Sequence, residues 1–137
     1  MAQKKTFALL VSNGNDSLNQ LKILLKSLGI ETWSANSCHE VSQLLEQTHP
    51  ELIFSSPRIE NGSWADVLGL TEKAPVPTNV IVVGKHKDTD LYLSTMDRGA
   101  FDFILPPFEA DPIGHVVRVA AEDVRRRRQE LALGAVA

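Results

Sequence analysis

Five short apolar segments recur along the chain, and each ends in polar or turn-forming residues. They cover residues 7–11, 30–35, 52–55, 80–83 and 101–105. Several of them are apolar throughout instead of alternating, which is typical of strands buried on both faces of a parallel sheet. The pattern therefore predicts five strands.

Between these segments, and after the last one, apolar residues recur at helical spacing. Helices are predicted over residues 16–28, 38–49, 64–71, 89–98 and from about 113 onward. Gly29 stands where a left-handed C-cap ends the first helix, and Ser37 with Glu40 has the spacing of a capping box for the second. In the last helix the periodicity continues as far as Leu133, beyond the length needed to cover a sheet.

Alternation of strands and helices predicts an α/β domain with a doubly wound parallel sheet and helices on both faces. In such sheets a ligand binds outside the carboxyl ends of the strands. Residues that follow predicted strands are therefore the candidate site, and these are Ser12, Asn13, Ser56 and Gly84.

The composition is that of a globular protein, with 43% hydrophobic and 23% charged residues among 137, the size of one domain. A net charge of -3 argues against nucleic-acid binding through bulk charge. No apolar run approaches the roughly 20 residues that span a bilayer. Since Cys38 is the one cysteine and no signal-peptide pattern opens the chain, we expect a cytoplasmic protein.

Several local motifs add to this architecture. The first predicted strand ends in a polar pair (Leu9–Asn13), and the first helix ends at Leu28–Gly29. The third strand (Leu52–Ser56) is followed by a loop with Asn61–Gly62, and an aromatic and proline-rich segment covers Asp102–Glu109. On these motifs the chain from about residue 6 to 125 resembles the receiver domain of bacterial response regulators. The resemblance implies a flavodoxin-like fold, strand order 2-1-3-4-5, and a role in two-component phosphorelay signal transduction.

The resemblance also indicates which residues occupy the family's phosphorylation pocket. Its acidic pair corresponds to Ser12 and Asn13, its phospho-acceptor aspartate to Ser56, its hydroxyl residue to Gly84 and its lysine to Pro106. An acyl phosphate needs a carboxylate nucleophile, and Mg²⁺ prefers anionic oxygen ligands. We therefore expect a degenerate pseudo-receiver that has no catalytic residues, no Mg²⁺ or other cofactor, and a role independent of phosphorylation.

Phe103 corresponds to the family's switch aromatic. Because Gly84 leaves room beside it, the ring is either held inward permanently or is an ordinary, partly exposed aromatic. The family's usual output and dimerisation face implies an interaction face that includes Tyr92, Arg98, Phe103 and Arg118. The expected partner is a protein or a fused output domain, with a homodimer as the alternative.

Other hypotheses stay open. A phosphorylatable receiver would need a displaced carboxylate such as Asp16 or Glu60, but Asp16 is placed to cap the first helix and Glu60 lies in a loop. Phosphorylation of Ser56 itself would mimic an acyl phosphate. A flavodoxin-like enzyme or nucleotide-binding protein would need residues 12–15 to cradle phosphate, and they lack the glycine spacing of such loops. A further hypothesis is that the chain is the N-terminal regulatory half of a transcription regulator or kinase.

The remaining features are expected to be structural. Four histidines without metal-ligand spacing are predicted to lie on the surface: His39, His49, His86 and His115. A helix N-terminus next to Cys38 would lower its thiol pKa, but no partner base is evident. By the resemblance, the Pro106–Pro107 bond is cis. Arg125–Arg128 are interpreted as a solvated helix end, and we divide the chain into a receiver-like domain (1–125) and a C-terminal helix extension or linker (126–137).

Overall fold

The protein is built on a five-stranded parallel sheet with the order β2-β1-β3-β6-β7. A computed structural model describes residues 5–14 and 18–136. The strands of this sheet are β1 (Phe7–Val11), β2 (Glu31–Ala35), β3 (Leu52–Ser55), β6 (Asn79–Val83) and β7 (Asp102–Ile104). Counted as the five predicted strands, this is the order 2-1-3-4-5, so the predicted fold is confirmed.

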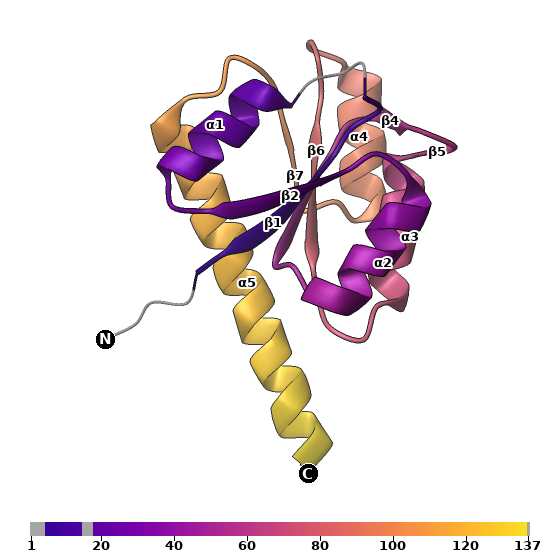
Figure 1. The fold of residues 1–137 in the computed structure, drawn as a ribbon, viewed down its shortest axis with the longest axis vertical. Coiled ribbons are helices and arrows are strands. Elements are labelled where there is room, and N and C mark those ends of the chain that lie inside the picture. The colour runs from indigo at the N-terminus through magenta and orange to yellow at the C-terminus, as the bar shows by residue number, and fades with distance from the viewer. Residues whose placement is uncertain (1–4, 15–17, 137) are drawn as a thin grey trace.

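Helices cover both faces of the sheet (Figure 1). On one face lie α1 (Asn19–Ser27) and α5 (Ala110–Val136). On the other lie α2 (Cys38–Thr48), α3 (Trp64–Lys73) and α4 (Thr89–Arg98). None of the helices in the described part of the chain combines the length and apolar character needed to cross a membrane.

The core consists of two layers because successive residues of a strand point to opposite faces. The layer under α1 and α5 includes Leu10, Phe54, Ile81, Leu25 and Val117. The layer under α2 and α3 includes Leu9, Ile53, Val82, Val41 and Val67. Burying one such side chain contributes about 1.5–3 kcal/mol, so the two layers hold the strand ends in fixed positions.

Local sequence signals set where the helices begin and end. Gly29 has a φ of 83° and follows α1, as predicted for a left-handed C-cap. At the start of α2 the Ser37 hydroxyl accepts a hydrogen bond from the Glu40 N–H, and the Glu40 carboxylate accepts one from the Asn36 N–H. The predicted cap at Asp16 lies outside the described residues.

A small hairpin was not expected between β3 and α3. Residues predicted as loop form β4 (Arg58–Ile59) and β5 (Gly62–Ser63), which pair antiparallel around a two-residue turn. Asn61 in this turn has a φ of 61°, a conformation that asparagine tolerates better than most residues. Strands of two residues are too short to show the alternation by which a strand is predicted.

The arginine run in α5 differs from its interpretation as a solvated helix end. Arg128 donates to the carbonyl groups of Pro77, Pro50 and His49 at 2.9, 2.8 and 3.1 Å. Arg125 donates to the Thr6 hydroxyl at 2.8 Å. These bonds tie α5 to loops at the amino ends of the strands, because the carbonyl groups there have no strand partner to satisfy them.

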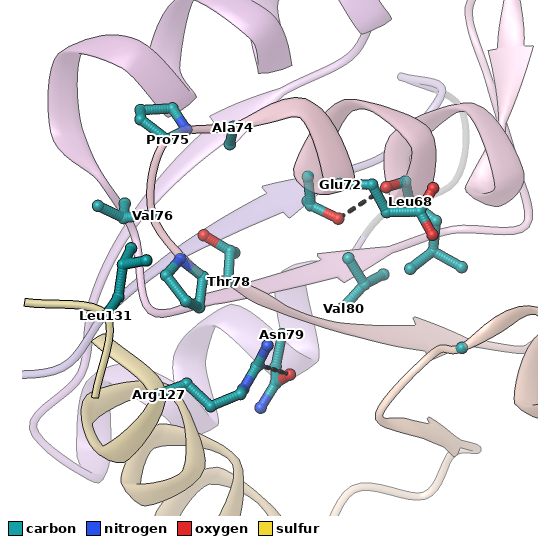
Figure 2. A pocket seen from close by; sticks show the side chains of 13 residues that line it. Leu68, Glu72, Ala74, Pro75, Val76, Thr78, Asn79, Val80, Arg127 and Leu131 are labelled. Atoms are coloured by element: carbon teal, nitrogen blue, oxygen red, sulfur yellow. Dashed lines mark hydrogen bonds between the residues drawn. The ribbon is translucent and has the colours of Figure 1, made fainter. Parts of the chain in front are cut away.

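Arg127 extends the same anchoring. It donates to the carboxylate of Asp123 and to the side-chain carbonyl of Asn79, at the start of β6. Figure 2 shows Arg127 against Asn79, with Leu131 beyond it on α5. Arg127 and Leu131, together with Val76 in the loop before β6, line a hollow of about 400 Å³. Helix α5 itself runs without a break across residue 125, the boundary that we expected between the receiver-like domain and its extension.

Candidate functional site

Three of the predicted site residues lie at the carboxyl ends of adjacent strands. Ser12, Ser56 and Gly84 directly follow β1, β3 and β6, which are neighbours in the sheet. The Ser56 N–H donates to the Val11 carbonyl at 2.8 Å, and the Gly84 N–H donates to the Ile104 carbonyl at 2.9 Å. The structure thus brings these residues together at the edge where open α/β sheets bind ligands.

Ser56, at the centre of this edge, is fully enclosed. Its exposed fraction is 0%, and its Oγ has no hydrogen-bond partner among the described residues. The preceding Ser55 is also buried, but its hydroxyl donates to the Ser56 carbonyl at 2.9 Å. An unpaired buried hydroxyl costs about 1–3 kcal/mol, so the surrounding structure tolerates an unfavourable group here.

Phe103 lies directly against Gly84. A Cβ added to Gly84 would stand 2.6 Å from Cζ of Phe103 and 2.8 Å from Cδ2 of Leu105, so one of these side chains would have to shift to admit it. The ring also meets Tyr92 edge-on, with the centroids 5.9 Å apart. The ring of Phe103 thus lies beside Gly84 and is at the same time partly exposed, so both alternatives for it stay open.

The other two residues of the predicted pocket lie at its rim. Asn13 follows Ser12 and is exposed, and Pro106 is exposed beyond β7. The Pro106–Pro107 bond is cis, as predicted. Neither residue carries a charged group, so Ser12, Asn13, Ser56, Gly84 and Pro106 form an edge without carboxylate or ammonium groups of their own.

A hollow of about 490 Å³ opens at this edge. Its wall comes from the end of β1, the loop and hairpin after β3, the first residues of α3, the loop after β6 and the first turns of α4. The lining residues are Asn13, Pro57, Arg58, Ser63, Trp64, Lys85, His86, Asp88 and Leu91. Trp64 therefore lies at this hollow.

The family of the chain follows from comparison with known domains. The model of the response regulator receiver domain matches residues 8–118. This chain belongs to that family. Domains of the family are regulatory and not catalytic, and the matched residues include the whole five-stranded sheet except Phe7, the first residue of β1.

Relatives of this receiver domain are regulators that are much longer than the chain. The response regulator PilR of Pseudomonas aeruginosa is 26% identical over 123 residues, which cover 90% of this chain and 27% of PilR. The nitrogen assimilation regulatory protein NtrX of Azorhizobium caulinodans is 31% identical over 107 residues, which cover 72% of this chain and 23% of that protein. The chain spans about a quarter of the length of the curated relatives it matches.

Solved receiver domains share the fold. The signal receiver domain of a LuxO repressor protein from Vibrio parahaemolyticus superimposes with a TM-score of 0.78 at 23% identity, over 94% of this chain and 98% of that one. NtrX from Brucella abortus gives a TM-score of 0.79 at 23% identity, over 95% of this chain and 30% of that one. At these identities the likeness establishes the architecture.

The residues predicted for an interaction face of the receiver domain have different side-chain contacts. Tyr92 and Phe103 are in contact, as described above. Arg98 pairs with Glu72 of α3, at 2.8 Å between Nη1 and Oε2. Arg118 contacts His115 within α5 and lines a groove between α5 and residues 28–30, which follow α1. Each of the two arginines thus has a polar partner of its own, and both are exposed.

Sequence reasoning missed apolar residues on the face of α4. Leu93 is 57% exposed and Met96 is 36% exposed, next to Tyr92 at 44%. Positions 92 and 96 are four apart and therefore share one side of the helix. The sequence shows that these residues are apolar but not how much of α4 the sheet covers. In the structure Thr95 is the one buried residue of α4, so the other apolar residues of this helix exceed what its contact with the sheet can cover.

The remaining candidates have structural surroundings. Burial, followed by the carboxylate of Asp66, raises the pKa of the Cys38 thiol, which reverses the lowering expected from the helix N-terminus. All four histidines are exposed. Glu60 is exposed in the turn of the hairpin, where its N–H donates to the Asn36 carbonyl, and Asp16 lies outside the described residues. Within the described chain no three His, Cys, Asp or Glu side chains are grouped as for a metal ion.

Proposed function

We propose that this receiver domain acts as a phosphorylation-independent interaction or regulatory module in cytoplasmic two-component signalling. The enclosed Ser56 carries the proposal. It stands at the phospho-acceptor position, its Oγ is buried without a partner, and a hydroxyl at neutral pH lacks the nucleophilic charge of a carboxylate.

The neighbouring residues support the loss of metal binding. Mg²⁺ in proteins is held by carboxylates together with water and phosphate oxygens. Ser12 and Asn13 offer only neutral oxygens at the position of the acidic pair, and Pro106 offers no ammonium group to a phosphoryl oxygen. A neutral edge of this kind folds without a cation, because it has no carboxylate repulsion to offset.

Phe103 supports a fixed conformation. In a receiver with a side chain at position 84, that side chain and the aromatic ring would compete for one space. Here Gly84 has no side chain, so the ring of Phe103 lies in that space, and Tyr92 packs edge-on against the ring. The face formed by Tyr92, Leu93, Met96 and Phe103, which we call the α4 face, is therefore presented in one state and serves as the output surface.

Intact-mass spectrometry after incubation with acetyl phosphate and Mg²⁺ tests the proposal. The wild-type chain is expected to gain no phosphoryl mass. A variant that restores the pocket, with Ser12→Asp, Asn13→Asp, Ser56→Asp and Pro106→Lys, is the matched control and is expected to gain one. A phosphorylated wild-type chain would overturn the proposal, and mapping the modified residue would show whether Asp16, Glu60 or Ser56 accepts the group.

Self-association through the α4 face is the second candidate, favoured by the exposure of Leu93 and Met96 beside Tyr92. Sedimentation equilibrium of the wild-type chain measures it. Leu93→Glu is expected to weaken association, whereas Ile23→Glu is not, because Ile23 is an equally apolar exposed residue on α1. A monomeric wild-type chain would leave a separate protein, or a fused output domain, as the occupant of this face.

A further inference from the structure

We infer that β2 is a docking edge for a second copy of this chain, which adds its own β2 antiparallel so that the two sheets continue into each other. The two-fold axis of this pair passes between the Trp33 residues of the two copies. The contact involves neither the phosphorylation pocket nor the α4 face, so it goes beyond the proposed function.

β2 is an open edge of the sheet. It stands first in the strand order, with β1 as its one neighbour among the described strands. The Glu31 N–H donates to the Thr6 carbonyl at 3.2 Å, so the odd-numbered residues of the strand direct their backbone groups toward β1. Thr32 and Ser34 alternate with them and direct their N–H and C=O groups to the open side, where a further strand can bond to them.

The side chains of β2 are open to solvent on both faces of the sheet. Ser34 is paired with Leu10, which belongs to the core layer under α1 and α5, and the Ser34 side chain is exposed. Trp33 is paired with Leu9, which belongs to the other layer, and is 50% exposed. The helices in the described part of the chain therefore leave room for another strand beside β2.

The opposite edge of the sheet is protected against pairing in ways that β2 is not. β7 has three residues, the Asp102 carboxylate accepts the Phe103 N–H at 2.7 Å, and Pro106–Pro107 follow closely. Short length, charge and proline are usual means by which edge strands avoid pairing. β2 has five residues without Lys or Pro, and Glu31 at its start carries the one charge. The two edges thus differ, and β2 is the one suited to a further strand.

The sequence of β2 complements itself in an antiparallel register. With Trp33 at the axis, the outward backbone groups of Thr32 meet those of Ser34 in the second copy, and the two hydroxyl groups lie opposite each other. Glu31 then lies opposite the small Ala35, so the two carboxylates stand at opposite ends of the contact. In-register parallel pairing would instead place Glu31 beside Glu31, which is destabilising. The occupant that fits this edge is therefore a second copy in antiparallel orientation.

Trp33 is the anchor of the contact. Its backbone groups face β1, so it takes a non-hydrogen-bonded position, where opposite side chains come closest. Phe7 meets the Trp33 ring edge-on, with the centroids 6.0 Å apart and the planes at 90°, and this contact orients the ring before association. Two copies then place four rings in one row across the joined sheets, and cross-strand aromatic pairs stabilise sheets.

Sedimentation equilibrium with a charge exchange tests the contact and its register. The wild-type chain is expected to dimerise with a Kd on the order of 0.1 mM, as for a small interface. Trp33→Lys and Trp33→Glu each place like charges opposite each other and should weaken dimerisation at least about tenfold. An equimolar mixture of the two variants should associate about fivefold more tightly than either alone, because opposite charges then face each other. Ile23→Lys, at a 69% exposed position on α1, is the matched control and should leave dimerisation unchanged.

Amide hydrogen exchange of the unsubstituted chain gives a second measurement that needs no variant. The outward N–H groups of Thr32 and Ser34 should exchange about fourfold more slowly at 1 mM than at 0.02 mM chain, since they are bonded in the dimer alone. Exposed amides elsewhere should not respond to concentration.

Three results would overturn the β2 contact. They are a wild-type chain that stays monomeric up to about 1 mM, a mixture of the two Trp33 variants that associates no better than either alone, and exchange at Thr32 and Ser34 that ignores concentration. Association that responds to Leu93→Glu but not to Trp33→Lys would also overturn it and would assign self-association to the α4 face. Phosphorylation of the wild-type chain by acetyl phosphate would overturn the proposed function and leave the β2 contact standing.

Discussion

The two ends of the sheet are held together by different means. At the amino ends of the strands, α5 sends Arg125, Arg127 and Arg128 into the loops, and each finds oxygen partners. At the carboxyl ends, Ser56 is buried without a partner and Gly84 is filled over by a neighbouring ring. Charged side chains therefore stabilise the amino ends of the strands. The carboxyl ends, where sheets of this kind bind ligands, are neutral at their centre.

This difference indicates which kind of change each end of the sheet resists. Hydrogen bonds from arginine to carbonyl groups stabilise one arrangement of loops and helix, and they are lost when any partner moves. A neutral, tightly filled strand edge resists the arrival of a charged group for the opposite reason, since no counter-charge is prepared for it. Substitutions at each end should therefore fail in different ways.

The largest effect is expected from a charge at the neutral end. Ser56→Asp places a carboxylate where the exposed fraction is 0%, and we expect it to lower the free energy of unfolding by about 3 kcal/mol or more at pH 7 with EDTA present. Burial raises the pKa of such a group, so stability should recover as the pH falls and the carboxyl is protonated. Urea unfolding measures both, with the uncharged Ser56→Asn as control; equal losses for the two variants would show that size and not charge is resisted.

The charged end is broken by removing Arg128. Arg128→Ala removes the donor to the carbonyl group of Pro77 and one of the two donors to that of Pro50, which keeps the Thr78 hydroxyl, and is expected to cost about 2 kcal/mol. Arg126→Ala, on the exposed side of the same turn, loses pairs to Asp123 and Glu130 and should cost no more than about 0.5 kcal/mol. Thermal and urea unfolding compare them, and similar losses would mean that the run acts only through its summed charge.

The filling of the neutral end is tested at Gly84. Gly84→Ala brings a Cβ against Phe103 and Leu105 and is expected to cost about 1–2 kcal/mol. In a Phe103→Leu background the same substitution should cost less, because the nearest ring atom is gone. A double-mutant cycle measures this coupling. Strict additivity would indicate that the ring does not occupy the space over the glycine.

The smallest expected effect is a pH dependence at the charged end. Burial works to raise the pKa of Asp123, but hydrogen bonds from Asn79 and Arg126 and the charge of Arg127 outweigh it and hold the pKa below its usual range. A carboxyl whose pKa is lowered in the folded state contributes stability above its unfolded pKa near 4, and this is lost as the pH falls toward the folded value. Asp123→Asn should flatten that acid loss in urea unfolding curves between about pH 5 and 2. An unchanged acid limb would assign the loss to other carboxylates.

The sequence predicted most of the neutral end and little of the charged one. Strand ends such as Ser12 and Ser56 could be placed because apolar runs stop abruptly and the sheet topology brings those ends together. The bonds of Arg128 could not, since its partners are backbone carbonyls about 50 and 80 residues away, and a carbonyl group has no sequence signature.

A similar limit applies to the predicted interaction face. Arg98 and Arg118 were assigned to it by the family resemblance, which did not indicate their partners, because side chains of this length reach whichever partner is nearest, Glu72 for one and His115 for the other. Tyr92 and Phe103 stayed together because two aromatic rings on adjacent elements pack by shape.

The unbroken course of α5 through Arg125–Arg128 also fixes a rotational phase. Val117 and Val124 are buried, and Leu131 follows them at the same spacing of seven residues, so the line that faces the sheet continues onto the part of the helix that projects beyond it. Successive residues of a helix are rotated by about 100° around its axis. The hydrogen bonds of the arginines hold α5 in one rotation relative to the sheet, and the projecting part of the helix shares that rotation. A single residue inserted after Arg128 would therefore leave the domain intact and point Leu131 roughly a quarter turn away from its present direction.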